Sequence, residues 1–219
     1  MRSTTMSLLA LTAAATIGQG QAATAGQSGH RALLPRDREI TLARSAAPAA
    51  VSDSATIFVL GERDWEIAVR GTNGVACHVN RSWVASLEPQ CYDAEGATTI
   101  MPMELRRTEL LHLGKSVEEV NRDIADGLAT GRFHLPRRPA LSYMLSAGQL
   151  LIADDGRSAG AWKPHLMIFF PFLTAVDLGL GANQDPQAAI VVDPGKPTAN
   201  IMIIVREFVQ PRTASVAAP

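Results

Sequence analysis

Residues 65–79 read WEIAVRGTNGVACHV, and they carry the clearest secondary-structure pattern in the chain. Trp65, Ile67 and Val69 alternate with other residues, and this period of two is typical of a strand with one solvated face. Residues 71–74, Gly-Thr-Asn-Gly, tolerate positive φ angles, and an extended pattern resumes at residues 75–79. The stretch therefore predicts a β-hairpin.

Four further stretches predict strands around this hairpin. Residues 55–60 are a run rich in β-branched and aromatic residues, and residues 140–146 are a further expected strand. Residues 165–173 and 200–205 are apolar with little alternation, which is typical of strands that are covered on both faces. We therefore expect these last two strands in the middle of a sheet.

Helical patterns occupy three other stretches. Residues 36–44 predict a short helix, and residues 103–113 place leucines among charged residues. Residues 116–119, Ser-Val-Glu-Glu, form a capping box that opens a helix whose apolar residues recur at three- and four-residue steps. Residues 83–103, interrupted by proline and glycine, predict irregular structure. Together these patterns predict an α+β fold, a mostly antiparallel sheet with an inserted helix pair packed on one face.

The N-terminal residues have the pattern of a secretory signal peptide. Arg2 is the only charged residue before residue 26, and residues 6–17 form an apolar run too short to cross a bilayer. Ala23-Thr24-Ala25 has the small-x-small form that signal peptidase cleaves. We expect a signal peptide at 1–25, a flexible leader at 26–34, one globular domain at 35–210 and a disordered tail at 211–219.

Composition narrows the classes of partner. The chain has 20 basic and 21 acidic residues, and this near-neutral balance argues against binding to nucleic acid or to an anionic membrane surface. No apolar run after the signal reaches the ~18 residues that a spanning helix needs. Cys77 and Cys91 are the only cysteines, and their spacing fits neither a C-x-x-C redox motif nor a zinc knuckle. An even count in an oxidising compartment favours a disulfide.

A serine hydrolase is one hypothesis for activity. Ser142 or Tyr143 would be the nucleophile and His165 the general base if their strands are adjacent, with Asp154 or Asp155 orienting the imidazole. The chain lacks a G-x-S-x-G elbow, and a serine on a strand has no evident oxyanion hole. A hydrogen-bonded structural histidine is the simpler interpretation of His165.

A ligand-binding surface is the second hypothesis. His78 and His165 lie within or beside predicted strands, and Tyr143 and Trp162 carry amphipathic rings of the kind that often line ligand sites. The same rings would also serve to close the ends of a core. No H-E-x-x-H motif, histidine pair or calcium loop occurs, so we expect neither a metal nor a cofactor.

Several short segments carry a resemblance to known proteins. They are residues 70–77, 81–83, 89–93, 105–110, 142–144 and 162–167. Together they resemble an uncharacterised family of exported bacterial proteins, over most of residues 35–205. The resemblance implies a bacterial source and a periplasmic or extracellular location. It implies no site residues, because the family has no established activity.

Taken together, the sequence predicts an exported domain that binds a small molecule or a protein partner. Any pocket is expected near His78, Tyr143, Trp162 and His165. The alternative is a secreted hydrolase that uses Ser142 or Tyr143 with His165.

Overall fold

A computed structural model describes residues 31–153, 156–158, 163–180 and 189–212. The predicted signal peptide, most of the predicted leader and residues 213–219 of the predicted tail lie outside these residues. Within them the strands form one mixed sheet in the order β2-β1-β3-β4-β5-β6-β8-β7. The strands are β1 (Thr56–Leu60), β2 (Trp65–Val69), β3 (Ala76–Asn80), β4 (Glu88–Tyr92), β5 (Ala140–Met144), β6 (His165–Phe169), β7 (Ile190–Val192) and β8 (Asn200–Ile204).

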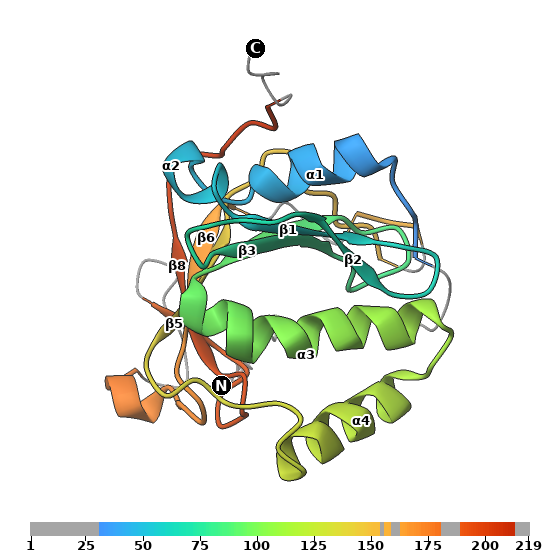
Figure 1. The fold of residues 1–219 in the computed structure, drawn as a ribbon. Helices are drawn as coiled ribbons and strands as arrows, with labels where there is room; N and C mark the ends of the chain where they lie inside the picture. The colour runs from blue at the N-terminus through green and yellow to red at the C-terminus, as the bar shows by residue number, and fades with distance from the viewer. Residues whose placement is uncertain (1–30, 154–155, 159–162, 181–188, 213–219) are drawn as a thin grey trace, which may run out of the picture.

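Helices cover both faces of this sheet (Figure 1). The helices of the described residues are α1 (Arg36–Arg44), α2 (Ala49–Ser52), α3 (Ala94–His112), α4 (Val117–Ala129) and the 3-10 turn η1 (Val176–Leu178). Helix α3 packs on β3, β4 and β5, and α4 packs against α3, whereas α1 packs on β1, β3 and β4 from the other side. The predicted α+β class, with the helix pair on one face, is confirmed. The two sides are called the α3 face and the α1 face below.

The predicted hairpin is wrong in its pairing, although both of its strands form. Strand β1 lies between β2 and β3, antiparallel to β2 and parallel to β3. The loop after β2 instead crosses the start of β1, where a Cβ on Gly71 would lie 2.2 Å from the backbone nitrogen of Thr56. Glycine permits this close approach. Strand β1 is more buried than β2. The more apolar strand therefore takes the position inside the sheet, where burial of its side chains stabilises the fold more, and β2 takes the edge.

The prediction of irregular structure over residues 83–103 is also wrong. Strand β4 lies within that stretch, and α3 begins at Ala94, where the backbone N–H of Gly96 donates to the Asp93 carboxylate at 2.8 Å. Pro89 lies in the part of β4 that is not paired with β5, because the pairing of β4 with β5 begins at Cys91. A proline there removes no bond to β5.

The other predicted elements form near their expected positions. The prediction that β6 and β8 are covered on both faces is wrong, because alternate residues of β6 are only half-buried and β8 ends in the exposed Ile203 and Ile204. Helix α1 has the predicted bounds, and the capping box before α4 forms between Ser116 and Glu119. Cys77 and Cys91 lie directly opposite each other in the β3–β4 register and form the predicted disulfide on the α1 face. None of the helices in the described residues is both long and apolar enough to cross a membrane.

Candidate functional site

The two faces of the central sheet differ in chemistry. On the α1 face, alternate residues of β1, β3 and β4 are apolar and pack into a core that includes the disulfide. On the α3 face, polar side chains occupy positions between core residues, and each of them is at most 5% exposed. They are His78, Asn80, Glu88, Gln90, Tyr92, Ser142, His165 and Asn200. Burying so many polar groups in one layer is costly unless each is bonded.

Part of this layer surrounds a cavity of about 160 Å³, which we call the α3-face cavity. Its lining residues come from β3 and β4 with the loop between them, from β5, β6, β7 and β8 with the loop between β7 and β8, and from α3. They are Asn80, Ser82, Glu88, Gln90, Tyr92, Glu104, Met144, Met167, Phe169, Val192, Asp193, Thr198 and Asn200. Three of them are acidic, none is basic, and the apolar ones are methionine, phenylalanine and valine.

Most side-chain amides and hydroxyls around the cavity have partners. The Thr108 hydroxyl donates to Asn80 Oδ1 at 2.6 Å, and the Tyr92 hydroxyl donates to Gln90 Oε1. The Asn200 Nδ2 donates to the Thr198 carbonyl at 3.2 Å. Asn200 Oδ1, in contrast, is buried and has no hydrogen-bond partner in the described structure. Asn200 therefore contributes an unsatisfied buried acceptor next to the cavity.

The carboxylates of the cavity have different roles. Glu88 accepts hydrogen bonds from the Ser82 backbone N–H and hydroxyl, both at 2.8 Å, and from the Ser86 hydroxyl at 2.7 Å. Glu88 therefore holds the turn between β3 and β4. Asp193, on the rim, forms an ion pair of 2.9 Å with Lys196. The backbone of Asp193 lies in the left-handed region, with a φ of 52°.

Glu104 projects from α3 toward the sheet. Burial raises the pKa of its carboxyl group, and the negative charges of Glu88 and Asp193 raise it further. Arg107, whose Nε lies 3.9 Å from Glu104 Oε1, and a hydrogen bond with Asn80 lower the pKa but do not cancel the shift. Three carboxyl groups thus line the cavity, and Glu104 and Asp193 each pair with a cation that lies outside its lining.

His78 lies beside the cavity and is fully buried. The centroid of its ring lies 5.3 Å from that of Trp65, which it meets edge-on, and 5.9 Å from that of Tyr92, on which it stacks. Within the described residues, neither of its nitrogens has a hydrogen-bond partner. Burial, with a smaller effect from the Arg81 charge, lowers its pKa to about 3. His78 is therefore neutral at physiological pH.

Two of the predicted catalytic residues, Ser142 and His165, lie on the same face of the adjacent strands β5 and β6, whereas Tyr143 lies on the other face. In the β5–β6 register Met144 lies opposite His165 and Tyr143 opposite Leu166, so Tyr143 points to the α1 face and His165 to the α3 face. Ser142 shares the face of His165, but its hydroxyl makes no hydrogen bond to that ring in the described structure. His165 Nδ1 lies 2.8 Å from the Lys163 carbonyl, so a backbone group holds the place that a carboxylate takes in a triad.

The predicted binding residues are likewise divided. His78 and His165 share the α3 face, but β4 and β5 lie between their strands, which separates them by about 14 Å at the usual strand spacing. Trp162, Asp154 and Asp155 lie outside the described residues. The lining residues of β4 fall in a stretch that was expected to be irregular, and several of the others lie in predicted elements whose order in the sheet local patterns do not specify. The alternation Glu88, Gln90, Tyr92 was the one available signal.

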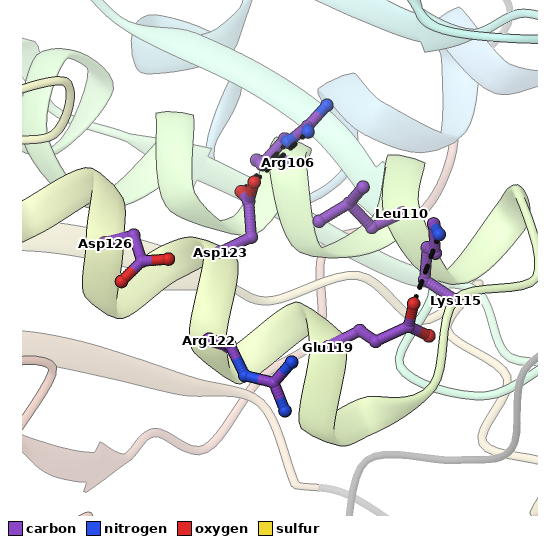
Figure 2. A pocket seen from close by; sticks show the side chains of 7 residues that line it. All are labelled: Arg106, Leu110, Lys115, Glu119, Arg122, Asp123 and Asp126. Atoms are coloured by element: carbon purple, nitrogen blue, oxygen red, sulfur yellow. Dashed lines mark hydrogen bonds and ion pairs between the residues drawn. The ribbon is translucent and has the colours of Figure 1, made fainter.

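A larger hollow of about 290 Å³ lies between α3 and α4 (Figure 2). Its charged side chains mostly pair with one another across or along the helices. Arg106 binds Asp123 at 3.1 Å, and Lys115 binds Glu119 at 3.1 Å. Lys115 and Glu119 are about half exposed, so solvent screens their charges. This hollow is a solvent-exposed junction between helices, and none of the buried, unpartnered groups of the described residues lines it.

Comparison of the chain with known protein families, with curated proteins and with solved structures finds no match. The resemblance to exported bacterial proteins therefore stays a prediction. In the described part of the chain, no group of three His, Cys, Asp or Glu side chains has the arrangement of a metal site.

Proposed function

We propose that this protein is an exported binding protein that holds a small polar molecule in the α3-face cavity. The observation that carries the proposal is Asn200, which lines the cavity, is only 3% exposed and has a buried amide oxygen with no hydrogen-bond partner among the described residues. An unsatisfied buried acceptor costs about 1–3 kcal/mol. A ligand that donates a hydrogen bond to Asn200 removes that cost on binding.

The size of the cavity limits the ligand. Pockets for drug-sized ligands and cofactors have volumes of about 300–1,000 Å³. The α3-face cavity, at about 160 Å³, is smaller than this range. The ligand is therefore a small metabolite rather than a nucleotide or a porphyrin.

The disulfide supports export, because such bonds form and persist in oxidising compartments. Together with the predicted signal peptide and the resemblance described above, it favours a periplasmic or extracellular location. Mass spectrometry of the mature protein tests this directly. We expect an N-terminus near residue 26 and no free thiol, and an intact Met1 would contradict export.

Filling the cavity tests the binding function. Thr198→Phe places a ring at the cavity wall, whereas Thr72→Phe adds the same ring to an exposed loop as a matched control. The wild-type protein is screened against small polar metabolites by thermal shift, with ¹³C-methyl labels on its methionines. We expect a ligand to raise the melting temperature and to shift the methyl signals of Met144 and Met167, which line the cavity.

Two results would count against the function. One is a screen in which no compound moves these two methyl signals. The other is binding that survives Thr198→Phe as well as it survives Thr72→Phe, because the ligand would then lie elsewhere.

A further inference from the structure

We infer that the ligand of the α3-face cavity is a small organic cation, bound through an ammonium group. This inference rests on the proposed function and adds the chemical class of the ligand. Its basis is the balance of donors, acceptors and charge in the cavity wall.

The unused hydrogen-bonding capacity of the wall belongs mainly to acceptors. The amide nitrogen of Asn200 and the hydroxyl of Tyr92 are already engaged as donors. Asn200 Oδ1 has no partner among the described residues, and the carboxylates of Glu104 and Asp193 retain acceptor sites beyond those that face Arg107, Asn80 and Lys196. An ammonium group has three donors and no acceptor, so its hydrogen-bonding pattern matches this wall.

The charge of the wall points the same way. Glu88, Glu104 and Asp193 line the cavity, and no lysine or arginine does. Glu88 and Asp193 each raise the energy of the charged form of Glu104, as the direction of its pKa shift shows. A monocation beside Glu104 would relieve this repulsion, whereas an anionic ligand would increase it.

The rest of the wall favours an organic cation over a metal ion. The rings of Tyr92 and Phe169 both line the cavity, with their centroids 6.3 Å apart, and Met144 and Met167 complete the apolar surface. Aromatic faces attract ammonium groups, and the methionines accommodate a short hydrocarbon chain. A metal site would need a cluster of ligating side chains, and the described residues contain no such cluster.

The experiment uses matched sets of small probes on the mature protein. Primary alkylammonium ions of one to six carbons are compared with the alcohols and the carboxylates of the same lengths, and binding is measured from the Met144 and Met167 methyl shifts. We expect saturable binding of at least one amine and weaker binding, by about tenfold or more, of its alcohol. The carboxylates should not bind.

Two charge-removing variants test the assigned groups. Glu104→Gln keeps the shape of the side chain, and Asp193→Asn keeps a residue that tolerates the left-handed conformation. Each should weaken amine binding by about 10- to 100-fold, because each removes a charge-assisted hydrogen bond. Glu118→Gln, on the exposed surface of α4, is the control and should change nothing.

The outcomes separate this inference from the proposed function. If neutral or anionic probes shift the two methionine signals as well as the amines do, the cavity binds ligands but the cationic class is wrong. The same conclusion holds if both charge variants bind amines with unchanged affinity. If no probe of any class shifts these signals, both the inference and the proposed function fail. Thermal unfolding of each variant confirms that it is folded, and either charge variant alone suffices for the test.

Discussion

The buried imidazole of His78 should make the protein less stable in mildly acidic solution. The unfolded chain takes up a proton on this ring near the ordinary pKa of 6.5, whereas the folded protein resists it down to a pKa of about 3. The folded pKa is depressed, so the stability is fully present above pH 6.5 and is lost as the pH falls toward 3. Substituting His78 by Phe removes this titration and keeps a planar ring between Trp65 and Tyr92.

The size of the effect follows from the two pKa values. Between pH 6.5 and 3, each unit of pH removes about 1.4 kcal/mol of unfolding free energy through this single site. At pH 4.5 the accumulated loss is about 2.7 kcal/mol. That is a large part of a typical total stability of about 5–15 kcal/mol.

Urea unfolding followed by circular dichroism at several pH values measures the effect. Other groups also titrate in this range, among them His165, whose pKa is also lowered by burial. The informative quantity is therefore the difference between wild type and His78→Phe. We expect the difference to change by about 2.7 kcal/mol between pH 7.5 and 4.5, in the direction of a relatively more stable variant in acid. Parallel curves for the two proteins would refute the assignment of a neutral, buried His78.

Three further substitutions test the rest of the fold by urea unfolding. Replacing Cys77 and Cys91 by Ala opens the cross-strand loop and should cost about 3 kcal/mol, and an unchanged midpoint would contradict a structural disulfide. Glu39→Gln leaves the Arg81 guanidinium buried without its carboxylate 3.0 Å away, and should cost about 3–5 kcal/mol, part of which Arg81→Met should restore. Gly127→Ala would place a methyl 2.3 Å from the buried ring of Phe133, so overpacking of about 1–3 kcal/mol should exceed the gain of about 1 kcal/mol in helix propensity. A stabilised Gly127→Ala variant would show that the ring moves freely.

Local patterns predicted those elements whose stability is local. The capping box of α4 and the apolar stripe that follows it involve residues at most four apart, and both are found where expected. The disulfide followed from cysteine count and compartment. Strand pairing is different, because the partner of β2 is chosen by burial across the whole sheet. Strand β1, and not β3, pairs with β2, and nothing in residues 65–79 alone indicates this pairing.

The cavity was beyond prediction for a related reason. Glu88 and Asn200 are 112 positions apart in the chain, and they line one cavity only because β4 and β8 lie in one sheet with α3 across it. The sequence analysis favoured histidines and aromatic residues, which are chemically versatile wherever they lie. The residues that matter here are ordinary polar ones made unusual by burial, and burial depends on the fold.

The contrast between the two faces of the sheet explains why such residues are retained. The disulfide side of β3 and β4 shows that these strands can build an apolar core. The opposite side of the same strands carries Asn80, Glu88 and Gln90 in place of apolar residues. These three side chains have hydrogen-bond partners, whereas Asn200 Oδ1 has none in the described structure. An unsatisfied buried polar group costs about 1–3 kcal/mol, so an apolar residue at position 200 would give a more stable domain. Natural sequences depart from local stability rules mainly where function requires it. The same reasoning predicts that Asn200→Leu should raise the unfolding free energy while abolishing ligand binding, a combination that a merely structural asparagine would not show.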